Sequence, residues 1–386
     1  MSADVLVVGG GIFGVAAAIE LRDRGANVTI LEPGPLPHPD ASSTDISKLI
    51  RADYGEDALY AALMEACLET WRRWNDRFPR PLFHETGLAV LSARPLSQAG
   101  FEGASFAALT ARGHNLERLD EKSLAERLPY WRPGRYVDGY INPQGGWAES
   151  GAVVTALAAE ARAAGVVIRE GVRVRPLPGD EAVTGVETES GERIAAGIVV
   201  IAAGALTPHL VPELSDRLCA IGQPVFHFDP PEGAPLTPPD FLPWAADIGT
   251  TGWYGFPVHA GVLKIANHGR GVPIDPSGER VVAPSWEEKF RAFLADALPS
   301  VAEAKVVRTR LCLYCDSFDG DFFLDAHPAR RGLVIAAGGS GHAFKFAPVL
   351  GKAIADAAEG VERARWSRFA WRARAAARTE AARARD

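Results

Sequence analysis

The sequence predicts a fold of mixed α/β and α+β class, in which a domain built around a parallel sheet is joined to a second domain. Three observations predict the parallel sheet. A short apolar run at residues 4–8 leads into a glycine-rich turn at 9–14 and then into a helical pattern. Far downstream, the segments 197–210 and 331–360 each contain another apolar run that ends in a turn of small residues. Buried strands that end in such turns are typical of open parallel sheets.

The turn after the first strand has the pattern G-x-G-x-x-G, formed by Gly9, Gly11 and Gly14. The helical pattern that follows ends at Gly25, a good C-cap residue, and the next apolar run ends in Glu32. The glycines allow a tight turn, close approach of a pyrophosphate and close helix packing. The helix N-terminus favours phosphate charge, and an acid at the end of the second strand bonds ribose hydroxyls. These elements predict a bound dinucleotide, and Glu32 disfavours one that carries a 2′-phosphate.

The dinucleotide is expected to be FAD. The fingerprint occurs once, and the returning segments 197–210 and 331–360 fit an elongated cofactor that crosses a discontinuous domain. A second fingerprint, which NAD(P)H would need, is missing from the sequence. This favours an oxidase or dehydrogenase over a reductase or monooxygenase fed by a pyridine nucleotide.

Bulk composition excludes several other classes. A net charge of −7 gives no general attraction to nucleic acid or to anionic lipid. No run approaches the roughly 18 to 20 apolar residues that span a bilayer. The N-terminus enters a strand at once, without a signal peptide, and the four cysteines suit a reducing setting, so we expect a cytoplasmic enzyme. Residues 361–386 are rich in Arg and Ala and predict a surface helix.

Two of the four cysteines, Cys312 and Cys315, stand three residues apart in an alternating segment that predicts a strand. Side chains at this spacing point to opposite faces, which disfavours a disulfide or a shared metal. No partnering C-x-x-C or H-x-x-H exists for zinc, so no metal site is expected. On this pattern alone the pair could be two ordinary buried residues. Cys67 and Cys219 are expected to be packing residues.

Over nearly its full length the chain resembles the amine-oxidising flavoproteins grouped around monomeric sarcosine oxidase, within the wider D-amino acid oxidase and glycine oxidase superfamily. Four blocks carry the resemblance: the fingerprint segment, "DISKLIRADYGE" (45–56), "WYGFPVHAGVLKIANH" (253–268) and "RLCLYCDSFDGDFFLDAHPARRGLVIAAGGSGHAFKF" (310–346). In that group a cysteine of the last block forms a thioether to the 8α-methyl of FAD. The spacing of the block assigns this role to Cys312, not Cys315.

The resemblance implies a function: oxidation of a secondary amine or N-substituted amino acid to an imine, with hydride transfer to FAD. Oxygen would then reoxidise the flavin and give hydrogen peroxide. The expected partners are therefore a small amine and molecular oxygen, with neither nucleic acid nor membrane, and the enzyme is expected to be a monomer.

Three cations match functional positions of the family. Arg51 and Lys345 would clamp the substrate carboxylate, and Lys264 would stabilise the charge that develops on oxygen. The alternatives are a surface salt bridge from Arg51 to Asp53 or Glu56, and an outward-facing side chain for either lysine.

His268 and Tyr254 also coincide with active-site positions of the family, and Lys48 stands where sarcosine oxidase has an arginine near the flavin. Tyr254 would contact substrate, while His268 would tune the protonation of the amine. Cofactor binding is assigned to a larger set in the glycine-rich turns and strand ends: Gly9, Gly11, Ile12, Phe13, Gly14, Glu32, Ser43, Val174, Ala203, Gly204, Cys312, Gly339, Gly341, His342 and Lys345.

Two segments, 45–55 and 142–150, look closer to the branch of fructosyl amino acid (Amadori) oxidases. Five aromatics would then line a larger pocket or belong to the core: Trp147, Trp253, Tyr254, Phe256 and Phe344. Two alternatives to this function therefore stay open. One is an Amadori oxidase, and the other is a biosynthetic cyclic-amine desaturase or dehydrogenase that passes electrons to a partner. A non-catalytic FAD-binding subunit is the alternative of a different class.

The same resemblance implies a division of the chain. A discontinuous, Rossmann-like FAD-binding domain would comprise residues 1–75, 147–210 and 319–386. Residues 76–146 and 211–318 would form a mainly antiparallel substrate domain, with the flavin ring at the junction.

Overall fold

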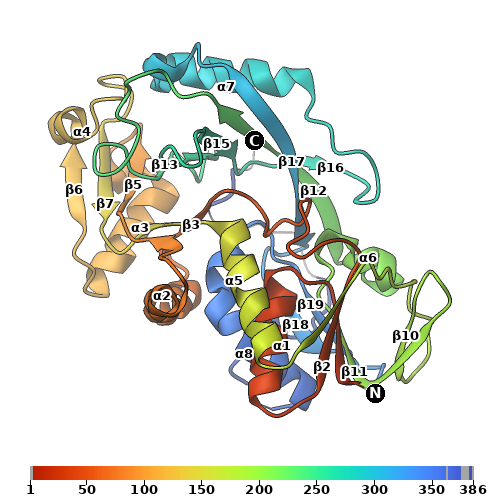
Figure 1. Cartoon of the computed structure of the whole chain (residues 1–386). Coiled ribbons are helices and arrows are strands. Elements are labelled where there is room, and N and C mark those ends of the chain that lie inside the picture. The colour runs from red at the N-terminus through yellow and green to blue at the C-terminus, as the bar shows by residue number, and fades with distance from the viewer. Residues whose placement is uncertain (1–2, 362–363, 375–381, 385–386) are drawn as a thin grey trace.

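The computed structural model describes residues 3–361, 364–374 and 382–384. Within these residues the chain forms two large sheets and one small sheet, with helices packed against them (Figure 1). The mixed α/β and α+β class that the sequence predicts is confirmed.

The first large sheet has the strand order β18-β19-β11-β1-β2-β9, and β10 pairs with β11 at its side. The strands β19, β11, β1, β2 and β9 run parallel, while β18 and β10 are antiparallel to their neighbours. Their bounds are β1 Ala3–Val8, β2 Val28–Glu32, β9 Val167–Glu170, β10 Gly185–Glu187, β11 Arg193–Ile201, β18 Phe323–Ala326 and β19 Leu333–Ala337.

Three helices lie side by side on one face of this sheet: α1 Ile12–Asp23, α5 Ser150–Ala163 and α8 Ala347–Glu359 (Figure 1). In the centre of the sheet, residues 5–8, 199–201 and 333–337 are apolar and buried because both faces are covered there, whereas the edge strand β9 is partly exposed. The short helix α6 Thr207–Leu210 follows β11, and residues such as Val211 and Leu214 pack on the other face. The helix predicted after the fingerprint ends at Asp23 with Arg24 as its C-cap, and Gly25 follows with a φ of 99°.

The second large sheet has the order β16-β12-β15-β14-β13-β5-β7-β6, and β17 pairs with β12. Its pairs are antiparallel, apart from β13 with β5. The strands are β5 Leu88–Ser92, β6 Glu117–Asp120, β7 Asp138–Asn142, β12 Leu218–Phe228, β13 Trp244–Ala246, β14 Trp253–Gly255, β15 Leu263–Asn267, β16 Val272–Pro273 and β17 Val306–Ser317.

Helix α7 Pro284–Ala297 lies along this sheet (Figure 1). Its Phe290 and Phe293 pack with Trp244 and Trp253 in one core. The remaining helices are α2 Ala58–Arg77, α3 Gly100–Ala111 and α4 Glu121–Arg127. A small sheet of β3 Lys48–Ile50, β8 Gly146–Ala148 and β4 Phe83–His84 accompanies the two large ones.

Strands of the first sheet all fall within the three stretches assigned to the FAD domain, and strands of the second fall within 76–146 and 211–318. The exact domain boundaries stay a prediction.

Two expectations were wrong. Cys219 is exposed rather than packed: it is the second residue of β12, and the rest of that strand is buried. The Arg/Ala-rich end does not form the expected surface helix over residues 364–374. It makes a single tight turn at Ser367–Phe369, and Trp366 and Phe369 are buried. The rest of that expectation lies outside the described residues, except at 382–384.

Candidate functional site

The fingerprint turn has the geometry that its glycines predict. Gly9 has a φ of 105°, and a Cβ there would lie 2.5 Å from the Ala202 carbonyl oxygen. A Cβ on Gly14 would lie 1.9 Å from the Gly9 carbonyl oxygen, so only glycine lets α1 approach the strand this closely. Glu32 ends β2, and its carboxylate accepts a hydrogen bond of 2.6 Å from the Gly10 N–H. Burial raises the pKa of Glu32, and this hydrogen bond opposes the rise.

A cleft of about 440 Å³ opens beside this turn, and residues of both large sheets line it. Besides Tyr254, thirteen of the residues assigned to catalysis or cofactor binding are among its lining residues: Gly9, Gly11, Ile12, Phe13, Glu32, Ser43, Val174, Ala203, Gly204, Cys312, Gly339, Gly341 and, from β3, Lys48. Tyr254 of β14 lines it as well. This lining fits an elongated FAD. Glu32 can bind the ribose, the turn Gly9–Gly14 at the N-terminus of α1 can bind the diphosphate, and Cys312 lies toward the second sheet.

Lys264 is the second residue of β15 and is 2% exposed, so it is not an outward-facing lysine. Its Nζ lies 2.7 Å from the Asp45 carboxylate and donates a hydrogen bond of 2.5 Å to the Ser47 carbonyl oxygen. Burial lowers the pKa of Lys264 to about 8, and Asp45 opposes the decrease. Asp45 lines the cleft, so the charge pair stands directly beside it.

Asp45 is itself held by cations. Burial raises the pKa of this carboxyl, but Lys264 and His227 outweigh burial and bring it well below its usual value. His227 stands opposite Lys264 in the pairing of β12 with β15, and its Nε2 lies 3.6 Å from Asp45. Burial also lowers the pKa of His227. Arg310 of β17 fixes the loop that carries Asp45, because its guanidinium donates to the carbonyl oxygens of Ala41 and Thr44.

Arg51 and Lys345 are brought together around one aromatic ring. The Arg51 guanidinium carbon and the Lys345 Nζ each lie 5.1 Å from the centre of the Tyr54 ring. Both side chains are 4% exposed. Helix α2 positions Lys345, since the Trp71 indole donates a hydrogen bond of 2.8 Å to its carbonyl oxygen.

The alternative of a surface salt bridge for Arg51 does not fit this geometry. The Arg51 guanidinium is buried and donates to the backbone carbonyl oxygen of Asp53. The Asp53 carboxylate accepts hydrogen bonds from Tyr140, at 2.6 Å, and from Asn142, at 3.4 Å. Lys345 likewise donates a hydrogen bond of 2.8 Å to the His342 carbonyl oxygen and is not a solvated lysine.

His268 follows β15 directly and is connected to Tyr254 by hydrogen bonds through the Tyr314 side chain. Its Nδ1 lies 3.2 Å from the Tyr314 hydroxyl, and Tyr314 is hydrogen-bonded to Tyr254. Burial raises the pKa of both tyrosines, so both hydroxyls keep their protons at neutral pH. The three side chains form a buried polar chain along the second sheet toward the cleft, which Tyr254 and Tyr314 line.

Cys312 and Cys315 both lie in β17, as predicted, and both are free thiols. Cys312 packs with Val225 and Ala266 of the second sheet, whereas Cys315 packs in the core of the first sheet. Burial raises the pKa of Cys315 to about 12, which makes it a poor nucleophile. No cluster suited to hold a metal ion occurs among the described residues.

Not every assigned residue reaches the cleft. Gly14 acts in packing, and His342 lies in an aromatic cluster, where its Nδ1 is 3.0 Å from the Tyr54 hydroxyl. Of the five aromatics named above, Tyr254 and Phe344 line the cleft and Phe256 lies under Lys264, 4.6 Å from its Nζ. Trp253 stacks on Phe293 in the core, and Trp147 stacks on His84.

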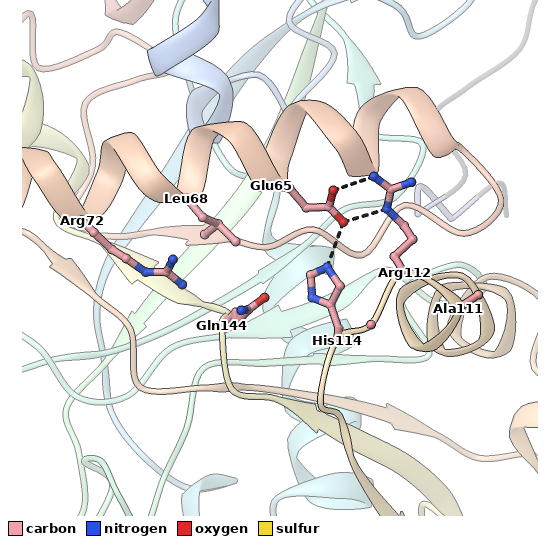
Figure 2. Close-up of a pocket in the computed structure, with 8 residues that line it drawn as sticks. Glu65, Leu68, Arg72, Ala111, Arg112, His114 and Gln144 are labelled. Atoms are coloured by element: carbon pink, nitrogen blue, oxygen red, sulfur yellow. Dashed lines mark hydrogen bonds and ion pairs between the residues drawn. The ribbon is translucent and has the colours of Figure 1, made fainter.

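A second pocket, of about 620 Å³, lies between α2 and the end of α3 (Figure 2). Glu65 dominates it, paired with Arg112 at 2.5 Å and with His114 at 2.9 Å. None of the assigned site residues lines it. The Glu65 carboxylate is already paired with Arg112 and His114, so this pocket is not a candidate active site.

Sequence reasoning missed Asp45, Tyr54, Tyr314 and His227. The first two stand within "DISKLIRADYGE", and Tyr314 stands between the two cysteines, so nearness to an assigned residue was the available signal. His227 carried no such signal.

The comparisons agree with this geometry. The family model described as "FAD dependent oxidoreductase" (DAO) matches residues 4–357. Monomeric sarcosine oxidase of Bacillus sp. (strain B-0618) is 28% identical over 92% of this chain and 92% of its own. N-methyl-L-tryptophan oxidase of Salmonella heidelberg (strain SL476) is 30% identical over 93% of this chain and 95% of its own.

A solved structure, the fructosyl peptide oxidase from E. terrenum, superposes with a TM-score of 0.85 over 97% of this chain and 93% of its own, at 22% identity. That likeness concerns the fold. Fold and cleft define a flavoprotein of the dinucleotide-binding class. The chain belongs to the family of FAD-dependent oxidoreductases, and the resemblance seen in the sequence is confirmed. No helix in the described ranges has both the length and the apolar character needed to cross a bilayer.

Proposed function

We propose that this chain is an FAD-dependent oxidase of N-methyl and other N-substituted amino acids. The observation that carries the proposal is the pair of buried cations, Arg51 and Lys345, which flank one tyrosine ring beside a flavin-sized cleft. A carboxylate is the ligand that two such cations recognise. The relatives named for sarcosine and for N-methyl-L-tryptophan act on amino acids methylated at nitrogen, which supports the same class here.

In this proposal Arg51 and Lys345 bind and orient the substrate carboxylate. Arg51 offers a planar fork and Lys345 a point charge, and in a buried site both act more strongly than in water. Binding one end of a small amino acid fixes where its nitrogen and the adjacent C–H bond lie. Such orientation is worth several kcal/mol of barrier in enzymes that pre-position their reactants.

The chain His268–Tyr314–Tyr254 would serve the amine. An amine must be neutral before the neighbouring carbon can lose a hydride, and ordinary amines are protonated at neutral pH. Nδ1 of His268 already exchanges a hydrogen bond with Tyr314, so the imidazole can hold a proton that the amine gives up.

FAD would be held at its diphosphate by the turn Gly9–Gly14, at its ribose by Glu32, and at its ring by residues near Lys48, Cys312 and Gly341. When bound, FAD supplies a hydride acceptor for the substrate carbon and passes the electrons to oxygen, giving hydrogen peroxide. Lys264, paired with Asp45 at the edge of the cleft, would stabilise the negative charge that develops on oxygen.

The test is anaerobic mixing of the purified yellow protein with sarcosine, N-methyltryptophan, proline, pipecolate and a fructosyl amino acid, while the visible flavin band is followed. Bleaching by an N-methyl amino acid, with recovery of colour and peroxide in air, is the expected result. Bleaching by the fructosyl amino acid alone would instead make the protein an Amadori oxidase. Bleaching without recovery in air would make it a dehydrogenase, and no bleaching at all would contradict the proposal.

Covalent attachment of FAD through Cys312 is part of the proposal. Cys312 lines the cleft, and it belongs to the register that carries the thioether in the sarcosine oxidase group. After acid precipitation the yellow colour should stay with the protein, and Cys312→Ser should release it to the supernatant. Cys315→Ser is the matched control and should keep it. A colourless wild-type pellet would refute the thioether.

We also propose that the enzyme is a cytoplasmic monomer that uses molecular oxygen. Light scattering of the eluted protein should give the mass of one chain, 41.2 kDa. Cell fractionation should place the protein with cytoplasmic markers.

A further inference from the structure

A short segment near the C-terminus is buried against the proposed substrate site. Ala382, Arg383 and Ala384 are 0%, 4% and 3% exposed. An arginine is almost never so buried unless its donors are satisfied.

The segment is fastened by specific polar contacts. The Ala384 N–H donates a hydrogen bond of 3.0 Å to the His268 carbonyl oxygen. Arg383 donates through Nε to the Gly269 carbonyl oxygen at 2.9 Å and through Nη2 to that of Arg270 at 3.3 Å. Its Nη1 pairs with the buried carboxylate of Asp316 on β17. The contacts join the segment to the end of β15 and to β17.

The side chains that the segment covers are those of the proposed site. Ala382 packs with Ala245 and Ile248 in a cluster bordered by Phe101 and Tyr254. The Arg383 guanidinium carbon lies 5.5 Å from the centre of the Tyr314 ring.

The side chains that border the segment also contact Arg51, one of the two residues proposed to bind the carboxylate. The Arg51 guanidinium carbon lies 5.6 Å from the centre of the Phe101 ring. Tyr254 and Tyr314 line the flavin cleft, whereas Arg51, His268 and Lys345 are not among its lining residues in the described chain. Tyr254 and Tyr314 therefore stand between the cleft and His268, and the segment packs against the same two tyrosines.

We propose that residues 382–384 form a wall of the substrate chamber, locked by the Arg383–Asp316 pair, and that this wall limits the size of the substrate. The inference rests on the proposed function and deepens it, since it concerns the same chamber. Small N-methyl amino acids fit behind the wall, and substrates with a large side chain must displace it. Arg383 is then a specificity-determining residue that acts by positioning the segment.

The test compares the wild type with Arg383→Gln and with a chain that ends at Ala381. Arg374→Gln, at an exposed arginine, is the matched control. For each protein kcat/KM is measured with sarcosine and with N-methyltryptophan. The ratio of the bulky to the small substrate should rise at least about tenfold in both altered proteins, the scale at which a pocket discriminates by size. It should stay unchanged in Arg374→Gln.

A second measurement needs no turnover. Acetate and indole-3-acetate carry the carboxylate without the amine, and their Kd values follow from the perturbed flavin spectrum. The Kd of indole-3-acetate should fall at least about tenfold relative to that of acetate when the segment is removed. If no amine is oxidised but this shift occurs, the proposed function fails and the wall stands.

Equal Kd ratios in all four proteins would overturn the inference. Loss of both ligands in the shortened chain would also overturn it, because the segment would then support the site and not restrict it. Should the shortened chain fail to fold, Arg383→Gln decides by the same two ratios. Trypsin tests whether the Arg383–Asp316 pair holds the segment in place. Cleavage after Arg383 should be faster in Asp316→Asn than in the wild type.

Discussion

Lys264 is a buried lysine whose charge depends on one buried carboxylate. Burial lowers the pKa of Lys264, Asp45 opposes the decrease and the nearby Lys48 adds to it, so the value lies at about 8. The charged form therefore predominates at neutral pH and is lost as the pH rises through about 8.

This balance predicts a pH profile for one half-reaction. The rate constant for oxygen with pre-reduced enzyme, measured by stopped flow, should fall as the pH passes about 8. Lys264→Met should lower it at least about 100-fold, as loss of a preorganised charge does, while anaerobic reduction by substrate changes little. Equal slowing of both half-reactions would remove the proposed role.

Asp45→Asn should move the midpoint of that profile below 8, because the neutral amide no longer stabilises the ammonium. Glu303→Gln, at an exposed carboxylate, is the control and should leave the midpoint in place. A midpoint that rises in Asp45→Asn would contradict the pairing seen in the structure.

At the scale of elements, residues 364–374 show why local propensity failed. Arg and Ala favour a helix, but this stretch is anchored by ion pairs instead. Arg368 pairs with Asp57, at the N-cap of α2, and with Asp321, at 2.5 and 2.8 Å. Arg372 pairs with Asp319 at 2.6 Å. Tertiary contacts outweigh the few tenths of a kcal/mol that propensity contributes per residue.

Arg372→Gln should therefore lower the free energy of unfolding in urea by about 1–3 kcal/mol, because it removes the arginine that pairs with the buried Asp319 carboxylate. Burial raises the pKa of Asp319, and Arg372 outweighs it, so the pKa lies below its ordinary value. The difference from wild type should be full at neutral pH and shrink as the pH falls below about 4. Arg193→Gln, 87% exposed, should change the free energy by less than about 0.5 kcal/mol.

The elements that sequence reasoning located correctly share one property: their signals are local. Gly9, Gly14 and Glu32 lie within one strand–helix–strand unit, so spacing alone identifies the nucleotide end. Lys264, Asp45 and His227 come from three separate parts of the chain. A single Asp or His has no periodic pattern around it, so the sequence alone does not predict that these residues meet. The burial of Arg383 is of the same kind, since only the folded chain brings it to Asp316.

For the whole molecule, the cleft is the place where the two large sheets meet. Gly9, Ala203 and Gly339 line it from the first sheet and its turns, and Val225 and Cys312 line it from the second. A cofactor that contacts both sides must bind the folded arrangement better than the unfolded chain, and it therefore stabilises the whole protein.

Removing FAD should accordingly lower the melting temperature. In Cys312→Ser protein stripped of flavin, FAD at about 1,000 times its Kd should restore about 4 kcal/mol of stability. For a chain of 386 residues this corresponds to a rise in Tm of about 5 °C in differential scanning calorimetry. FMN lacks the adenosine half, cannot reach Glu32, and at the same concentration should give a smaller rise. An equal rise with FMN would mean that the nucleotide end contributes nothing and that the fingerprint turn does not bind the cofactor.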